Sequence, residues 1–474
     1  MAKPNAVARR VLIIGAGDAG ERVVQDMWQN PAYDRLPVAF IDDDPKKRSS
    51  MIHDVPVLGS IQEIEAIINK VRPDEILIAI PSATQVQTRG IIAQCKPFGL
   101  PIKTLPGLAD LFRCRVSVTQ IRSLDIEDLI GRPEIILCHP EMKTKIAGKR
   151  VLVTGAGGSI GSEICRQVAA LYPETLILLE QNENNLHHIQ IDLTEKFPST
   201  HMEIVLGDIL DQKRLELVFV THRPQVIFHA AAYKHVPMME AHPLKAVQNN
   251  ILGAYQVMMM ADCYQADEFV LLSTDKAVCP ASVMGATKRV AEMLSQFFNL
   301  KSKTKFMSVR FGNVMESNGS VVPLFREQIK KGGPVRVTHP NVERYFITIK
   351  EAVQLVLHTA ILGTGGEVFV LDMGKPIKII DIARTMITLS GFSPDQDIPV
   401  EFIGLRPGEK LTETLFEKGE EVIQTRFAKI KLVQNRKIEQ DMVAYMEKFT
   451  IMDDQTDTGQ IKRVLKELVP NYSV

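Results

Sequence analysis

The sequence predicts an α/β protein with two Rossmann-like, doubly wound parallel sheets. Two glycine-rich turns support this prediction, because each stands between a short apolar run, at residues 11–14 and 151–154, and a helical pattern. Further apolar runs alternate with helical patterns after both turns, as in strands joined by crossover helices. At 474 residues, 45% of them hydrophobic, the chain can build more than one core.

The charge balance and the cysteine spacing argue against nucleic-acid binding, metal sites and disulfide bonds. Lys plus Arg and Asp plus Glu both total 56, so no overall basic field for nucleic acid is expected. The six cysteines form no C-x-x-C pair, so we expect no zinc or other metal site and no disulfide framework. No apolar run approaches the roughly 18 residues of a membrane span. These features predict a cytoplasmic protein without a membrane span.

Residues 1–104 are predicted to form the first domain. Gly15, Gly17 and Gly20 follow the G-x-G-x-x-G spacing of dinucleotide-binding turns. Asp42 follows the next strand, where a ribose-binding carboxylate is expected. The other expected strands are 38–41, 75–80 and 101–104, with helices near 60–70 and 84–97. No catalytic cluster follows, so a regulatory or vestigial nucleotide site and a purely structural role both stay open.

Residues 105–147 are rich in Gly and Pro and are predicted to be a connector, after which residues 148–474 form the second domain. Its expected strands are 151–154, 176–179, 203–206, 226–229, 269–272 and 306–309. Beyond residue 311 the Gly and Pro content rises again. This rise predicts a loop-rich substrate lobe, mainly residues 311–420, over the carboxyl edge of the sheet. Residues 411–474 are predicted mostly as polar helices and a short strand.

The second glycine-rich turn is predicted to bind the pyrophosphate of NAD. Gly155 allows the sharp turn, Gly158 a close approach to the phosphates, and Gly161 close packing of helix on strand. Glu180, about 20 residues further on, can accept hydrogen bonds from the adenosine ribose and repel a 2′-phosphate, which favours NAD over NADP. Asp208, directly after a later strand, is expected to accept from the adenine amino group, or else to cap a helix. The alternative for the whole turn is an ordinary βα connection.

Reactive side chains follow the strand predicted at 269–272. Thr274, Asp275 and Lys276 should stand at the carboxyl edge of the sheet, and Lys288 lies on the next helix. The spacing is similar to that of short-chain dehydrogenases, in which Y-x-x-x-K follows this strand. Here Met284 stands in the place of the tyrosine and cannot exchange a proton. A simple alcohol dehydrogenase is therefore not expected.

Dehydration of a hexose fits these residues better. Once C4 is oxidised, the ketone acidifies the C5 hydrogen. We assign Lys276 as the base at C5, Asp275 as the acid at O6, and Thr274 as a hydrogen-bonding group near O4. A lysine base must be neutral, which requires desolvation or neighbouring positive charge from Lys288 and the oxidised nicotinamide. The alternative is a surface Asp–Lys pair of little energetic value.

These residues, with others along the chain, resemble the long-form bacterial nucleotide-sugar 4,6-dehydratases, close to the UDP-N-acetylglucosamine 4,6-dehydratases that retain the configuration at C5. The matching stretches are residues 128–133, 153–163, 229–240, 249–250, 273–278, 283–289, 309–314, 344–346 and 406–410. The resemblance implies an extended short-chain dehydrogenase fold, NAD as a recycled cofactor and UDP-N-acetylglucosamine as substrate. It also implies a homo-oligomer and a role in polysaccharide or glycoprotein glycan biosynthesis.

The resemblance further implies that Lys234 and His235 line the sugar site. The residues that it implies for UDP and its ribose are Asn313, Arg344, Arg406 and Glu409. For Arg406 and Glu409 the alternative is an exposed ion pair in a turn. The expected cofactor site comprises Gly155, Gly158, Ser159, Ile160, Gly161, Glu180, Asp208, Ile209, Ala230, Ala231 and Lys288.

The chain departs from that family in two places. Family members usually carry several membrane-spanning helices before the soluble region. This chain is therefore expected to be either a truncation, which would place the protein at the inner face of the cell membrane, or a naturally soluble form. Residues 279–282, Cys-Pro-Ala-Ser, replace an Asn-Pro-Thr-Asn segment and are expected to affect sugar preference. Two other functions stay open. One is a UDP-N-acetylhexosamine 4-epimerase, which would need a tyrosine in place of Met284, and the other is a nucleotide-sensing regulator built on the first glycine-rich turn.

Overall fold

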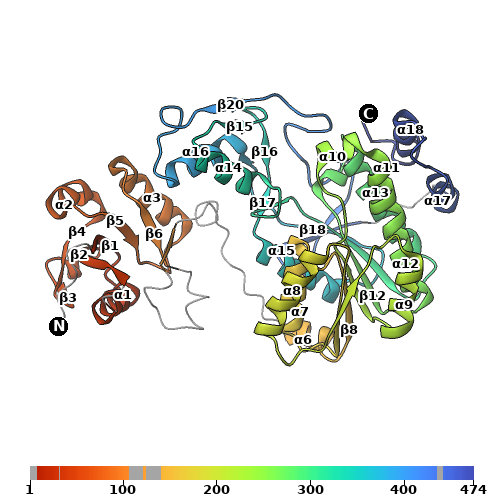
Figure 1. The fold of residues 1–474 in the computed structure, drawn as a ribbon, viewed down its shortest axis with the longest axis horizontal. Helices are drawn as coiled ribbons and strands as arrows, with labels where there is room; N and C mark the ends of the chain where they lie inside the picture. The colour runs from red at the N-terminus through yellow and green to blue at the C-terminus, as the bar shows by residue number, and fades with distance from the viewer. Residues whose placement is uncertain (1–7, 31–32, 106–120, 124–139, 435–440, 474) are drawn as a thin grey trace. The chain divides into compact units, whose positions relative to one another are not determined.

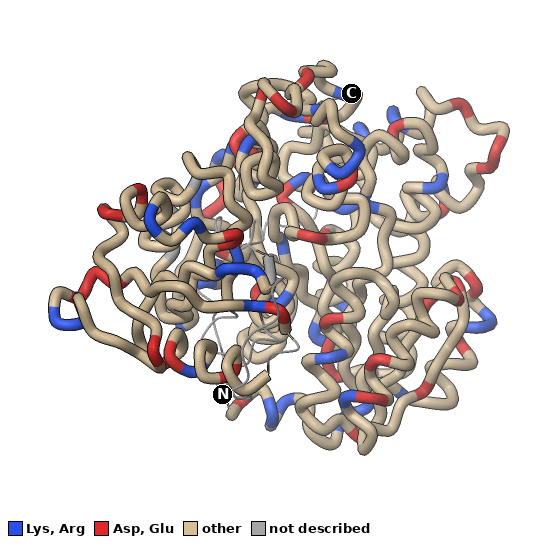
Figure 2. Tube along the Cα trace, turned by 60° about the vertical axis from the view of Figure 1, so that its left-hand side comes forward, with Lys and Arg blue, Asp and Glu red and all other residues tan. Residues whose placement is uncertain are grey.

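A computed structural model describes residues 8–30, 33–105, 121–123, 140–434 and 441–473 (Figure 1). The chain divides into two compact units. The first unit contains the described parts of Met1–Ile136, together with Leu324–Arg336 and Ile380–Glu401, and the second contains the remainder. Residues 128–133, one of the stretches that carry the family resemblance, lie outside the described residues. Figure 2 shows acidic and basic residues interspersed along the chain, so neither sign dominates a long stretch.

The first unit is built on a seven-stranded sheet in the order β3-β4-β2-β1-β5-β6-β7. Its strands are β1 (Arg9–Ile14), β2 (Arg35–Ile41), β3 (Met51–Ile52), β4 (Val55–Gly59), β5 (Glu75–Ile78), β6 (Ile102–Thr104) and β7 (Arg122–Ser123). The pairings among β4, β2, β1, β5 and β6 are parallel. Helix α1 (Asp18–Gln29) packs on one face, and α2 (Ile64–Val71) and α3 (Gln85–Cys95) pack on the other.

The strands expected in the first unit are confirmed, but the sequence did not reveal β4. This strand contains Pro56, a residue that argues against a strand because it cannot donate to a sheet ladder. In the structure Pro56 sits opposite Met51 in the antiparallel pair of β3 and β4. The strand therefore depends on tertiary pairing rather than on local preference.

The second unit is built on a nine-stranded sheet in the order β10-β9-β8-β11-β12-β13-β18-β22-β21. The strands are β8 (Arg150–Thr154), β9 (Thr175–Glu180), β10 (Met202–Leu206), β11 (Val226–His229), β12 (Glu268–Leu272), β13 (Lys305–Arg310), β18 (Val368–Leu371), β21 (Val422–Gln424) and β22 (Ile430–Val433). Pairing is parallel from β10 to β18, whereas β22 and β21 are antiparallel. The order of the first six strands is that of a doubly wound dinucleotide fold, which confirms the predicted fold class.

Six strands are expected in this sheet from the sequence, and β18 is not among them. Its run of four apolar residues lies among the Gly and Pro residues that suggested a loop-rich lobe. In the structure, α15 (Ile349–Leu362) and β18 instead add a further helix and strand beside β13. The C-terminal region contains two short strands, β21 and β22, as well as the expected helices.

Helices cover both faces of the larger sheet (Figure 1). One face carries α6 (Pro140–Ile146), α7 (Ser159–Ala169), α8 (Glu183–Lys196) and α15, so a helix forms within the region predicted as a connector. The other face carries α9 (Gln212–His222), α12 (Ala254–Cys263) and α13 (Val283–Asn299), with the C-terminal helices α17 (Met442–Thr450) and α18 (Thr458–Leu468) packed on the same core. Among the described residues, no helix combines the length and the apolar character needed to cross a membrane.

Smaller elements follow β11, β12 and β13 along the chain. They are α10 (Val236–Ala241), α11 (Pro243–Val247), a π-helix (Gln248–Gly253), a 3-10 turn (Asp275–Ala277), β14 (Asn313–Val314), α14 (Val321–Lys330), β15 (Val335–Val337), β16 (Glu343–Arg344), β17 (Phe346–Ile347), β19 (Ile377–Lys378), α16 (Ile379–Leu389) and β20 (Val400–Phe402). Strand β14 pairs with β17, and β16 pairs with β19.

Replacement of Gly161 by alanine tests the close packing of α7 on the end of β8. A Cβ atom at Gly161 would collide with the Gly155 carbonyl oxygen, so we expect Gly161→Ala to lower the free energy of unfolding by about 1–3 kcal/mol. Gly90→Ala is a matched control, because a Cβ at Gly90 on α3 meets no heavy atom within 4 Å. Urea unfolding followed by circular dichroism measures both variants, and an unchanged midpoint for Gly161→Ala would contradict this close packing.

Candidate active site

The glycine-rich turn connects β8 to α7 at the carboxyl edge of the larger sheet. Gly155 has φ +67°, a conformation that favours glycine, and a Cβ there would lie 2.8 Å from the Ala231 amide nitrogen. Gly157, which the glycine spacing does not mark out in the sequence, packs so closely on α8 that a Cβ would lie 2.5 Å from Asn185. Gly158 is the N-cap of α7 and has no side chain to accept from its first amides. These amides are therefore available to an anion.

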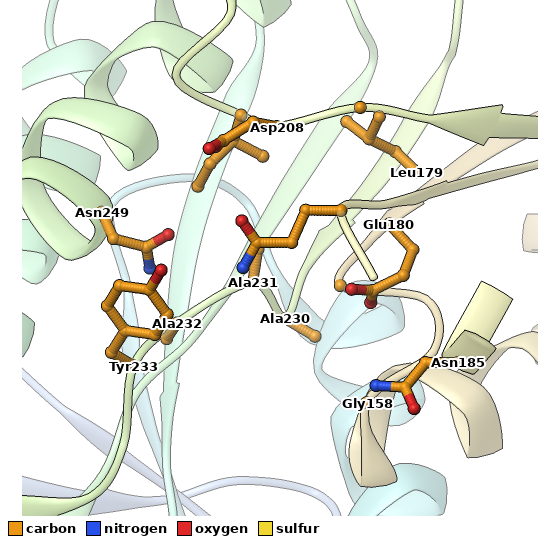
Figure 3. A pocket seen from close by; sticks show the side chains of 14 residues that line it. Gly158, Leu179, Glu180, Asn185, Asp208, Ala230, Ala231, Ala232, Tyr233 and Asn249 are labelled. Carbon is orange, nitrogen blue, oxygen red and sulfur yellow. The ribbon is translucent and has the colours of Figure 1, made fainter. Parts of the chain in front are cut away.

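A pocket opens beside this turn at the carboxyl ends of β8, β9, β10 and β11 (Figure 3). The residues that line it are Gly155, Gly158, Leu179, Glu180, Gln181, Asn185, Gly207, Asp208, Ile209, Ala230, Ala231, Ala232, Tyr233 and Asn249. Figure 3 shows Glu180 and Asn185 on one side of the space, and Asn249 and Tyr233 on the other. Seven of the expected cofactor residues thus meet in one pocket: Gly155, Gly158, Glu180, Asp208, Ile209, Ala230 and Ala231.

Glu180 connects the end of β9 to the glycine turn. Its carboxylate accepts from the Gly157 amide at 3.0 Å and from the Asn182 amide at 2.9 Å, and the residue is 8% exposed. Asp208 accepts from the Leu210 amide at 2.9 Å, while Asp211 caps α9. Asp211, and not Asp208, is therefore the residue that caps this helix. Asp208 lines the pocket. The donors and acceptors fit a dinucleotide, with a pyrophosphate at α7 and a ribose at Glu180.

The other residues expected at the cofactor are held near the turn by packing. Ser159 begins α7, and its hydroxyl accepts from the Asn318 amide at 3.1 Å. Ile160 packs on the core of the sheet. Asn250, which the sequence analysis singled out only as part of the family resemblance and gave no role, accepts from the Tyr233 amide at 2.8 Å and donates to the Tyr233 carbonyl at 3.0 Å. Two adjacent asparagines within an apolar helical stretch were the available signal.

Thr274, Asp275 and Lys276 lie directly after β12, the neighbour of β11 in the sheet. The Lys276 ammonium donates to Asp275 Oδ1 at 3.0 Å and to Asn313 Oδ1 at 2.8 Å. The Thr274 hydroxyl donates to the same Asp275 oxygen at 2.9 Å. Asp275 is fully buried, and its second oxygen, Oδ2, has no hydrogen-bond partner among the described residues. A buried acceptor in this state is suited to bind a proton or a ligand group.

The backbone around this group leaves it little freedom. The Asp275 amide donates to the Phe311 carbonyl at 3.0 Å, which joins the turn after β12 to the turn after β13. Gly285, in the first turn of α13, lies so close to the Lys276 carbonyl oxygen that a Cβ there would collide with it. The alternative of a surface Asp–Lys pair is therefore incompatible with the structure, because Asp275 is buried.

Met284 and Lys288 lie on the first two turns of α13. Met284 is 3% exposed and belongs to the apolar core, so it presents no proton donor. Lys288 is 6% exposed, and burial lowers the pKa of its ammonium to about 8. His229, at the end of β11, donates to or accepts from the Thr154 hydroxyl at 2.8 Å. Burial and the nearby charge of Lys288 lower its pKa to about 3, so His229 is neutral near pH 7.

The residues implied for the sugar lie at the start of α10. Lys234 and His235 are exposed, yet partial desolvation lowers the pKa of both side chains. The positive charges of Lys234 and Arg406 lower the pKa of His235 further, so these three groups share one neighbourhood. His235 also packs on the loop at Gly319, where a Cβ would lie 2.5 Å from its ring.

The residues implied for the nucleotide divide into an anchor and a turn. Arg344 is 7% exposed, and its guanidinium donates to the carbonyls of Glu343, Lys410 and Leu411 at 2.7–3.1 Å. Arg406 and Glu409 bind each other across the turn, with Nε to Oε1 at 3.0 Å. Arg344 thus holds the end of the turn in place. Arg406 and Glu409 form the ion pair within the turn that was the expected alternative. Asn313 accepts a hydrogen bond from Lys276.

Comparison with known proteins assigns the family. Residues 151–435, more than half of the chain, match the family described as polysaccharide biosynthesis protein. The chain belongs to that family. Residues 3–106 match a second family, described as CoA-binding domain.

Curated relatives include proteins of both dehydratase and epimerase type. The probable polysaccharide biosynthesis protein EpsC of Bacillus subtilis is 45% identical over 433 residues, which cover 91% of this chain and 72% of the relative. A UDP-glucose 4-epimerase of Rickettsia bellii is 32% identical and covers 57% of this chain and 79% of its own. The inverting UDP-N-acetylglucosamine 4,6-dehydratase of Campylobacter jejuni is 30% identical, and the match covers 59% of this chain and 81% of that relative. Overall identity therefore does not separate the two reactions.

Solved structures share the fold of the second unit. Pen from Bacillus thuringiensis has a TM-score of 0.56 at 32% identity, covering 61% of this chain and 90% of its own. DesIV from Streptomyces venezuelae, a dTDP-glucose 4,6-dehydratase solved with NAD and DAU bound, has a TM-score of 0.51 at 20% identity, covering 56% and 88%. The likeness to DesIV shows a common fold.

A buried cluster of charged residues lies at the carboxyl ends of β12 and β13, beside the turns that carry Asp275, Lys276 and Asn313. Glu292, on α13, accepts from the Ser273 hydroxyl at 2.6 Å and from two guanidinium nitrogens of Arg310 at 2.8 Å. Arg310 also pairs with Glu420 at 3.2 Å, and Arg289 pairs with Glu292 at 2.9 Å. Burial by itself raises the pKa of Glu292, but the arginines outweigh it and lower the pKa to about 2. Sequence reasoning missed this cluster because its members are far apart in the chain.

Removal of the Glu292 carboxylate would take from the buried Arg310 the partner that accepts from two of its nitrogens, and leave it paired with Glu420. We expect Glu292→Ala to lower the free energy of unfolding by about 3–5 kcal/mol. Glu327→Ala is the control, because Glu327 on α14 forms only an exposed pair with Lys331 and its loss should leave stability unchanged. Urea unfolding of the two variants measures the difference, and equal midpoints would contradict the structural role of the cluster.

Proposed function

We propose that the chain is an NAD-dependent nucleotide-sugar 4,6-dehydratase acting on UDP-N-acetylglucosamine. The product would be a UDP-2-acetamido-2,6-dideoxy-4-hexulose. The observation that carries this proposal is the contact of Lys276 with a fully buried Asp275 whose second oxygen has no partner among the described residues. The pair stands at the same edge of the sheet as the pocket that fits a dinucleotide, because β12 neighbours β11.

The choice of NAD rests on the glycine turn and on Glu180. The α7 amides would hold the pyrophosphate, and the Glu180 carboxylate would bind the ribose and disfavour a 2′-phosphate. Lys288, whose buried ammonium keeps a charge near pH 7, would hold the nicotinamide ribose. When bound, NAD accepts a hydride from C4 of the sugar and returns it to C6. DesIV, which shares the fold, was solved with NAD.

The Asp275–Lys276 contact supplies both an acid and a base. A net shift of one proton from the Lys276 ammonium to Asp275 Oδ2, the oxygen without a partner among the described residues, gives a neutral amine and a carboxylic acid. Oδ1 then stays an acceptor for the amine. The amine of Lys276 then takes the C5 proton, and the C5–H electron pair forms the C5=C6 double bond as the C6–O6 bond breaks. Asp275 gives its proton to O6, which leaves as water. Lys276 finally returns a proton to C5, and the O4 proton, relayed by Thr274, replaces the proton that Asp275 gave to O6.

Met284 favours dehydration over epimerisation. An epimerase needs a group that exchanges the O4 proton in both directions, which tyrosine can do and a thioether cannot. Thr274, hydrogen-bonded to Asp275, would relay the O4 proton here. Lys234 and His235 would line the sugar, and Asn313, Arg406 and Glu409 would contact the nucleotide, with Arg344 holding their turn in place. A homo-oligomer and a role in glycan biosynthesis remain part of the proposal.

The reaction is tested with purified protein, NAD and UDP-N-acetylglucosamine. Mass spectrometry should show a product lighter by one water molecule, without added reductant. Lys276→Ala should bind NAD like the native protein yet eliminate no water, because the base is lost. Lys331→Ala, at an exposed site on α14, should retain full turnover. Unchanged dehydration by Lys276→Ala would overturn the base assignment, and an unmodified substrate with the native protein would overturn the function.

The role of Glu180 is tested by calorimetric titration with NAD. We expect Glu180→Ala to weaken NAD binding at least about tenfold, because the variant loses the ribose acceptor and the contact with the Gly157 amide. Glu174→Ala, an exposed residue that pairs with Arg150, is the control. Equal affinity of the native and Glu180→Ala proteins for NAD would refute the ribose role.

A further inference from the structure

Among the described residues, the side-chain nitrogen of Lys276 has two hydrogen-bond acceptors, which come from different elements. Asp275 belongs to the same 3-10 turn, whereas Asn313 begins β14, after the next strand of the sheet. We propose that Asn313 is a positioning residue that sets the direction of the Lys276 lone pair during C5 proton abstraction. This inference rests on the proposed dehydratase function and assigns Asn313 a task beyond contact with the nucleotide.

The two acceptors can orient the Lys276 amine because of the geometry of its nitrogen. A neutral lysine nitrogen has two N–H donors and one lone pair, arranged roughly tetrahedrally around it. The acceptors on Asp275 and Asn313, at 3.0 and 2.8 Å, match the two donors. With both donors engaged, the lone pair must point away from both oxygens. Only one direction therefore remains for the proton that the amine accepts.

Asn313 is suited to this task because its backbone is fixed. Its amide donates to the Tyr345 carbonyl at 2.9 Å, and β14 pairs in parallel with β17. The preceding Gly312 has no space for a side chain, since a Cβ would lie 2.9 Å from Tyr345. The Lys276 backbone is held by the close approach of Gly285. The backbones that carry the amide and the amine are thus both fixed by neighbouring elements.

The uncharged amide also matters. Asn313 accepts a hydrogen bond without adding a second negative charge beside Lys276, where Asp275 is already present. A carboxylate at position 313 would favour the ammonium, a form that cannot take a proton. An amide is therefore the side chain that aligns the base and leaves it basic.

The test compares kcat and KM for Asn313→Leu and Asn313→Asp, each checked for folding by its thermal midpoint. For Asn313→Leu we expect kcat to fall about 100-fold and KM to rise by less than about tenfold, because loss of alignment lowers kcat more than loss of the nucleotide contact raises KM. For Asn313→Asp we expect the acid limb of the kcat–pH profile to move up by about one unit or more. Asn69→Asp, which adds the same charge at an exposed site of α2, should leave the profile unchanged.

A substrate deuterated at C5 provides the second readout. The isotope effect on kcat should increase in Asn313→Leu, because proton abstraction becomes slower than the other steps. A raised KM with native kcat, or an unchanged isotope effect and an unmoved pH profile, would overturn the positioning role and leave Asn313 as a nucleotide contact. Failure of the native protein to release water would instead overturn the proposed function, so the two failures are distinguishable.

Discussion

The active edge of the second unit depends on the buried pairing of Glu292 with Arg310. Glu292 reaches the end of β12 through the Ser273 hydroxyl and the end of β13 through Arg310. The two strands carry Asp275 with Lys276 and, a few residues on, Asn313. The Glu292 carboxylate has no exposure to water, and its hydrogen-bonding partners include residues at both strand ends. The charge pair thus fixes the spacing of the groups above it.

Burial also separates the roles of the ionisable groups at this edge. Lys288 and His229 lie close together, and burial destabilises the charged form of each side chain, which lowers both pKa values. The outcome differs because their ordinary pKa values differ: the lysine keeps its charge near neutral pH and the histidine does not. The site therefore contains a positive group beside a neutral hydrogen-bonding group, which suits hydrogen bonding to a ribose.

In both units, a carboxylate at the end of the second strand accepts a hydrogen bond from an amide of the glycine-rich turn. In the second unit Glu180 accepts from the Gly157 amide, and in the first unit Asp42 accepts from the Ala16 amide at 2.8 Å. Asp42 additionally pairs with Lys47 at 3.1 Å. Both carboxylates connect the end of a second strand to the turn after the first strand. The shared arrangement explains why both turns are recognisable in the sequence, and the match of residues 3–106 to a different family shows that they belong to different modules.

The sequence by itself determined the two parallel sheets, the glycine turns and the Thr274–Lys276 group, because these depend on local patterns: apolar runs of strand length, glycine spacing, and polar residues at strand ends. The tertiary structure alone decided the pairing of β4 and β18 into their sheets. It also decided the partners of Arg344 and the contact of Asn313 with Lys276. Such contacts join residues distant in the chain, and their energies depend on burial and on which strand ends meet, which no local pattern encodes.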